Sequence, residues 1–156
     1  MDTAVYKVFL SVTFWSAFCA WMVAQFSKMI RGFILYRTFD FRYIVSTGGI
    51  ISAHSAMVCG LATSLGLNHG FDSPFFCIGL GYALITMLDA ATVRRAAGQQ
   101  AALLNQLFDT ILKEHKLPGG KKLGELLGHT RIEVFCGMVT GILVAVAVNS
   151  LAILFW

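Results

Sequence analysis

The sequence predicts an all-α integral membrane protein with about four transmembrane helices and one further amphipathic helix. Its 156 residues are 57% hydrophobic and 13% charged, and the mean hydropathy is +0.73. An average globular chain carries about twice that share of charge. Four windows come near the ~20 apolar residues that a span needs, and basic residues gather in alternate connections between them. The length suits one membrane-embedded domain over residues 1–156.

The four apolar windows are the candidate membrane spans. We expect the second to begin at Ser52, because serine suits a helix N-cap and Gly48-Gly49 before it suits a flexible or re-entrant approach. The windows are Ala4–Gln25, Ser52–Gly70, Pro74–Val93 and Ile132–Trp156.

The basic residues predict the orientation of these spans. One lies in or before the first window, four follow it, none falls in 67–73 and seven lie in 94–131. The positive-inside rule then places both basic connections in the cytoplasm and both termini outside. Because the bases flank apolar runs, anionic lipid headgroups suit them better as partners than nucleic acid does. We therefore expect the polar residues at the cytoplasmic face of the cell (plasma) membrane.

Residues 95–116 form the predicted amphipathic helix, with Leu103, Leu107 and Ile111 four residues apart. This apolar stripe could pack on the bundle, lie in the membrane interface or join two copies into a homo-oligomer. Leu117-Pro118-Gly119-Gly120 should end the helix. The four cysteines are isolated within apolar runs, so the sequence predicts no metal site and no cofactor.

Two histidines lie at the predicted mouths of spans. His54 falls on the first turn of the second span, where free backbone N–H groups suit a phosphate oxygen and an imidazole could move a proton. The alternative is an interfacial histidine that only hydrogen-bonds a carbonyl. His129 and Glu133 are four residues apart, a spacing that lets a carboxylate orient a reactive imidazole. Thr130-Arg131-Ile132-Glu133 also matches a helix capping box, and the sequence does not separate the two.

Several charged residues flank the same ends of the spans. Asp89 is an intramembrane acid, a candidate functional residue whose simpler role is an ion pair with Lys28 or an arginine. Arg94 and Arg95 could bind phosphate or only mark the cytoplasmic side. Lys28 and Arg31 would share one helical face and carry the same two alternatives.

Four ordered blocks of sequence carry a family resemblance. The chain resembles the divergent branch of the type 2 phosphatidic acid phosphatase family, which is related to the vanadium haloperoxidases, from about Ala24 to the last span. The blocks are STGGIISAHSA (46–56), GFDSPFF (70–76), LDAATVRRAAGQQAALLNQL (88–107) and ELLGHTRIEV (125–134).

The resemblance implies a metal-independent phosphatase of lipid phosphates or diphosphates. It implies that His129 is the histidine that becomes phosphorylated, that Glu133 orients it and that His54 is the acid. Asp89 would be a structural or orienting residue. The implied phosphate-binding residues are Lys28, Arg31, Ser52, Arg94 and Arg95.

The chain departs from the family motifs at several positions. In the second motif Ile51 replaces proline and Ala53 replaces glycine, and Glu133 replaces the aspartate of the third. Leu123 stands where the third-motif arginine would fall, and Leu35 where the first-motif arginine would. The expected substitutes for these arginines are Arg94 or Arg95, more weakly Lys121 or Lys122, and Arg31 or Arg37 respectively.

The sequence thus favours a lipid phosphatase that acts through a phosphohistidine at the cytoplasmic face. The alternative is a catalytically inactive lipid-phosphate binder, transport component or scaffold, which the missing third-motif arginine favours.

Overall fold

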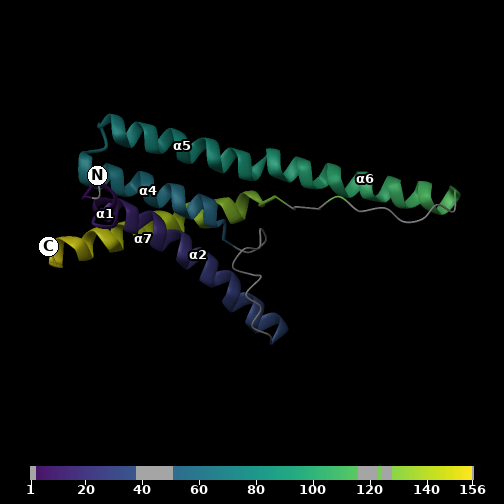
Figure 1. Ribbon diagram of the computed structural model, residues 1–156, viewed down its shortest axis with the longest axis horizontal. Coiled ribbons are helices and arrows are strands. Elements are labelled where there is room, and N and C mark those ends of the chain that lie inside the picture. The colour runs from purple at the N-terminus through teal and green to yellow at the C-terminus, as the bar shows by residue number, and fades with distance from the viewer. Residues whose placement is uncertain (1–2, 38–50, 116–122, 124–127, 156) are drawn as a thin grey trace.

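The computed structural model describes residues 3–37, 51–115, 123 and 128–155, and these residues form helices without a strand. Helix α4 lies at the centre and packs against α2, α5 and α7 (Figure 1). The helices are α1 (Thr3–Phe9), α2 (Val12–Tyr36), α4 (Ala53–His69), α5 (Pro74–Ala91), α6 (Val93–His115) and α7 (Arg131–Phe155).

Serine caps begin three of these helices. The hydroxyl oxygens of Ser11, Ser52 and Ser73 each accept a hydrogen bond from the backbone N–H three residues later, at 3.4, 3.4 and 3.2 Å. Pro74 takes the first position of α5, where its missing N–H has no cost. Gly70, at φ 91°, ends α4 in a backbone conformation that only glycine adopts readily. The predicted start at Ser52 and end near Gly70 are confirmed.

The first predicted window is misplaced. Helix α1 ends at Phe9, and α2 begins at Val12 and continues to Tyr36, so a break falls inside Ala4–Gln25. Ser11 causes the break because its hydroxyl caps α2, a local preference that an average over hydropathy does not register. Lys28 and Arg31 consequently lie on one continuous helix, as expected. Two predictions lie outside the described residues. They are the flexible or re-entrant approach at 48–49 and the end of the amphipathic helix at 117–120.

Small residues bring α4 and α7 into backbone contact. A Cβ atom on Gly137 would lie 2.5 Å from the Ser52 carbonyl oxygen, and one on Gly141 would overlap the Ala56 carbonyl oxygen. On the other side of α4, a Cβ on Gly60 would lie 3.0 Å from the Ala20 Cβ. In lipid, where tails are as apolar as the helices, such close approach is a main source of helix association. This packing brings the first turns of α4 and α7 together.

A polar cluster joins α2, α4 and α7 at the other end of the bundle. The Asn149 amide donates to the Ser16 and Ser64 hydroxyls, both at 3.1 Å, and accepts from Asn68 at 2.7 Å. Interhelical hydrogen bonds of this kind hold membrane helices together.

The outer surface of the bundle is apolar, as a bilayer requires. Two stretches of the described chain are long and apolar enough to cross a membrane, Pro74–Ile111 and Arg131–Leu154. Their outward side chains, such as Ile78 and Ile153, are exposed. Helix α4 has 17 residues and is therefore only about 26 Å long. The count of four spans stays a prediction.

Helix α6 continues nearly in line with α5 and extends beyond the bundle (Figure 1). Among the described helices it contacts α5 alone, and Leu103 and Leu107 are exposed. Its apolar stripe thus does not pack on the bundle, which leaves the membrane interface and a second copy. Asn105 holds the backbone of Leu123 with two hydrogen bonds of 2.9 Å, one donated by its amide nitrogen and one accepted by its amide oxygen.

Candidate active site

The candidate site lies where the N-termini of α4 and α7 meet. The Ser52 N–H donates to the Glu133 carbonyl oxygen at 3.1 Å and joins the two first turns directly. The first helical bond of α4 is donated by Ala56, so the N–H groups of Ala53 and His54 precede the helical ladder. Two helix N-termini direct partial positive charge into the same region, which favours an anion there.

Glu133 contacts His129 and caps α7 at the same time. Its Oε2 lies 3.2 Å from His129 Nδ1 and accepts the Thr130 N–H at 2.9 Å, and the Glu133 N–H donates to Thr130 Oγ1 at 3.3 Å. The two interpretations that the sequence left open therefore hold together. The capping box fixes the carboxylate, and the carboxylate in turn fixes the His129 ring, whose side chain is 8% exposed. With Nδ1 engaged, Nε2 is the ring nitrogen that can react.

Helix α2 contributes Lys28, which lies beyond the expected end of the first span at Gln25. Its side chain is 5% exposed. Burial lowers the pKa of the Lys28 ammonium from its ordinary value of 10.5, and the negative charge of Glu133 opposes part of that shift. Lys28 thus lies within electrostatic range of the carboxylate that orients His129.

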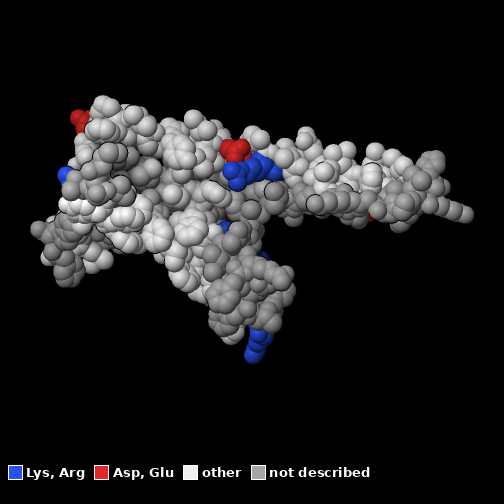
Figure 2. Space-filling view, viewed as in Figure 1, with Lys and Arg blue, Asp and Glu red and all other residues white. Residues whose placement is uncertain are grey.

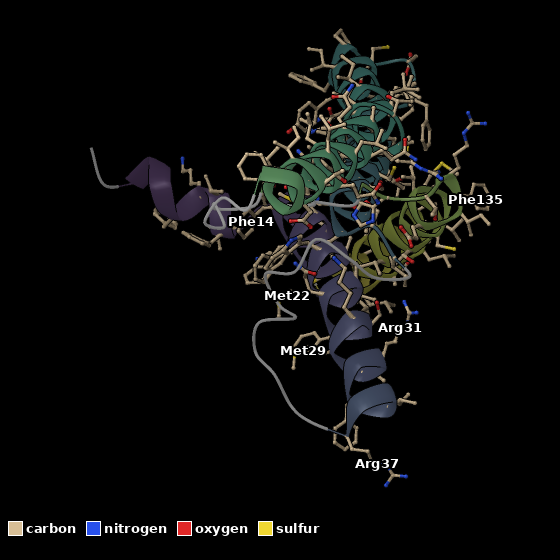
Figure 3. The ribbon with its side chains drawn as sticks, turned by 90° about the vertical axis from the view of Figure 1, so that its right-hand side faces the viewer. Phe14, Met22, Met29, Arg31, Arg37 and Phe135 are labelled. Atoms are coloured by element: carbon tan, nitrogen blue, oxygen red, sulfur yellow. The ribbon has the colours of Figure 1, made fainter. Side chains whose placement is uncertain are left out.

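The two other bases, Arg31 on α2 and Arg37 at its C-cap, are exposed, whereas Lys28 is buried. Arg31 is exposed and projects outward from α2 (Figure 3). Arg37 ends the helix about 14 Å further along its axis than Lys28. We therefore rank both behind Lys28 as phosphate ligands.

The exposed His54 imidazole lies near several charged groups. The charges that act on it are those of Arg94, His129, Lys28 and Asp89, from three helices and the turn before α7. The structure thus brings together residues that are far apart in the sequence.

Asp89 and Arg94 form an ion pair where α5 meets α6. Arg94 Nε lies 2.8 Å from Asp89 Oδ2, one of the pairings that the sequence suggested for this acid. Both side chains are exposed, so the pair adds little stability but holds the guanidinium in place. Figure 2 shows acidic and basic side chains gathered at this junction.

Gly128 explains how the arginines come near His129. A Cβ atom on Gly128 would lie 2.7 Å from the carbonyl carbon of Arg94 and would overlap the backbone of Arg95. The chain just before His129 is therefore pressed against the first turn of α6, while the Arg95 side chain is exposed. Sequence reasoning missed this glycine, whose only signal was its place next to His129.

One predicted contributor, Ser52, is not placed as a phosphate ligand. The Ser52 side chain is fully buried, and its oxygen accepts hydrogen bonds from the N–H and hydroxyl of Ser55. Ser52 therefore acts as the buried N-cap of α4. Lys121 and Lys122 lie outside the described residues. Arg131, which sequence reasoning treated only as part of the capping box, is exposed at the first position of α7.

The donor set suits a phosphate. It combines the Lys28 ammonium, the Arg94 guanidinium and two helix N-termini with the imidazoles of His54 and His129. Within the residues that the structure describes there is no group of three or more His, Cys, Asp or Glu side chains that could hold a metal ion.

Comparison with known proteins gives the family. The model of the Divergent PAP2 family matches residues 9–144. The chain belongs to this family. This confirms the resemblance seen in the four sequence blocks. The chain is also 45% identical over 138 residues to the uncharacterized membrane protein YuiD of Bacillus subtilis (strain 168). The match covers 82% of this chain and 87% of the relative. No solved structure matches this divergent PAP2 protein. It is an all-α, phosphatase-related membrane protein.

Proposed function

We propose that this protein is a metal-independent phosphatase of lipid phosphates or diphosphates that acts at the cytoplasmic face of the cell membrane. The observation that carries the proposal is the His129–Glu133 pair at the meeting of two helix N-termini, beside Lys28. A buried imidazole oriented by a carboxylate and surrounded by positive charge is suited to attack a phosphate.

The reaction has two steps. His129 Nε2 attacks phosphorus in line with the leaving oxygen, the P–O bond breaks, and His54 gives a proton to the departing alcohol or phosphate. Water then attacks the phosphohistidine and gives a proton back to His54, the N–P bond breaks, and inorganic phosphate leaves with the His129 and His54 imidazoles restored. Throughout, Lys28, Arg94 and the first N–H groups of α4 compensate the charge on the phosphoryl oxygens. Arg95 and Arg31 would meet the outer part of the headgroup.

A non-catalytic lipid-phosphate binder or scaffold is the second candidate. Leu123 stands where the family's third-motif arginine would fall, and Asn105 holds its backbone at α6. Arg94 would then have to supply the positive charge of the third motif, and its guanidinium already forms an ion pair with Asp89. Such a protein would keep the phosphate cradle without turnover, and the exposed stripe of α6 could join two copies.

Phosphate release by the purified protein distinguishes these functions. Mixed micelles with phosphatidic acid, phosphatidylglycerol phosphate or a polyprenyl diphosphate would be assayed without added metal and with a chelator. We expect release that the chelator does not affect and that His129→Ala abolishes. Full activity in a folded His129→Ala protein would refute the mechanism. Lipid-phosphate binding without release, equally sensitive to Arg94→Ala and His54→Ala, would instead support the binder.

A further inference from the structure

An apolar groove of about 370 Å³ lies between α5 and α7. Its walls are Leu84, Met87, Leu88, Val134, Phe135 and Met138. Ala91, Thr92 and Arg131 complete the lining at one end, where α5 stops and α7 begins.

The groove exists because α5 and α7 both pack on α4 but scarcely touch each other. Gly79 lets α5 approach α4, since a Cβ there would lie 2.9 Å from a Leu65 methyl carbon, and Gly137 and Gly141 do the same for α7. Met87 and Met138 pack against a buried cluster of small side chains from α4 and α5 and form the floor. Methionine is flexible and unbranched, so this floor can adapt its shape to what lies on it.

One end of the groove adjoins the candidate active site. Arg131 is two residues after His129, and Thr92 lies between the paired residues Asp89 and Arg94. From Arg131 to Met138 the groove extends about 10 Å along α7. A cation thus stands at the end nearest the reactive histidine, and purely apolar side chains line the rest.

The outer side of the groove faces the region that a bilayer would occupy. Leu88 and Phe135 are exposed at its rims, and Phe135 projects outward from α7 (Figure 3). A molecule could therefore enter sideways from the membrane with its polar end toward Arg131.

We propose that the α5–α7 groove binds one hydrocarbon chain of the substrate while the phosphate lies at His129. This inference rests on the proposed function and deepens it, because it makes the substrate a lipid that is recognised by its chain as well as by its phosphate. Continuity with the charged site favours the substrate chain over bulk lipid or a helix of a second copy. Arg131 at the boundary would meet the anionic headgroup.

A matched pair of variants on α5 tests the groove. Leu84→Trp fills it, whereas Ile85→Trp adds the same indole at the next position, which is 69% exposed and outside the lining. The readout is the ratio of kcat/KM for dioleoyl phosphatidic acid to kcat/KM for p-nitrophenyl phosphate. We expect this ratio to fall about 10-fold or more in Leu84→Trp, on the scale of discrimination by an apolar pocket, and to stay at the wild-type value in Ile85→Trp. Equal ratios in the two variants would overturn the inference.

Photolabelling tests the groove independently of turnover. Phosphatidic acid with a diazirine in one chain would be cross-linked to the intact protein in phosphatidylcholine vesicles, and the labelled residues mapped. We expect labelling concentrated on the groove walls and suppressed by excess phosphatidic acid but not by extra phosphatidylcholine. Labelling spread over all lipid-facing helices, or suppressed equally by both lipids, would show only bulk lipid. Specific groove labelling in a protein that releases no phosphate would keep this inference and refute the phosphatase.

Discussion

The dual role of Glu133 yields a prediction that separates catalysis from folding. In Glu133→Gln the side chain can still accept the Thr130 N–H, because glutamine serves as well as glutamate in a capping box. One oxygen of Glu133, Oε2, makes both contacts, so an amide oxygen in its place keeps the Thr130 N–H bond and the His129 tautomer. The variant loses the negative charge opposite His129 Nδ1, which stabilises the positive charge that the ring gains when Nε2 attacks phosphorus. We expect kcat to fall by about 10², less than the ~10⁴ of the equivalent change in a serine protease triad, where the wrong tautomer adds to the loss of charge. The free energy of unfolding should change by less than about 0.5 kcal/mol.

Thr130→Ala is the complementary change. It removes the hydroxyl that accepts the Glu133 N–H at 3.3 Å but leaves the Glu133 carboxylate in contact with His129 and the Thr130 N–H. We expect a loss of about 1 kcal/mol in stability, the usual cost of an N-cap, with kcat within a few-fold of wild type.

Both variants would be compared by phosphate release in mixed micelles and by thermal unfolding in detergent. Full activity in Glu133→Gln would refute the orienting role of the carboxylate. A Thr130→Ala protein that unfolds like wild type and is as inactive as Glu133→Gln would refute the separation of the two roles.

Three further predictions concern charge and packing. Lys28→Met should weaken inorganic phosphate binding about 10-fold in equilibrium titrations. In the wild type, the unfolded state holds the Lys28 proton more tightly, so the free energy of unfolding should rise with pH between the lowered pKa of Lys28 and 10.5. Lys28→Met should flatten this rise, as measured by thermal unfolding at about pH 7 and about pH 10. An equal rise in the variant and the wild type would contradict the lowered pKa of Lys28. Gly141→Ala should destabilise the protein by about 1–3 kcal/mol because its Cβ overlaps the Ala56 carbonyl, whereas Gly81→Ala, with open space around its Cβ, should be neutral or stabilising in the same assay. Asn149→Leu should cost about 1 kcal/mol and leave kcat unchanged, because it lies about 24 Å along α7 from Glu133; a loss of kcat without a loss of stability would contradict a purely structural role.

The secondary structure was predictable where local signals were strong. Ser52, Pro74 and Gly70 mark helix ends through bonds and dihedral angles within a few residues, so their sequence determines them. The first window was misplaced because a local signal was overlooked. The Ser11 cap begins a new helix within a run of residues whose average hydropathy is continuously apolar.

The candidate site was only partly predictable. The spacing of His129 and Glu133 indicated their contact, and the family blocks pointed to the arginines before any geometry was known. The Gly128 contact that brings those arginines to His129 depends on how the segment before α7 meets α6, which no local pattern encodes.

By itself, the sequence determined the membrane class and the family, because composition and motif order are properties of the chain alone, and it offered the pairing of His129 with Glu133 as one of two interpretations. Only the tertiary structure decided that Lys28, His54 and Arg94 lie near that pair, and that an apolar groove with Arg131 in its lining lies between α5 and α7. The physical reason is that this arrangement depends on how closely helix backbones approach, which small residues such as Gly137 and Gly141 permit only where they face a partner helix.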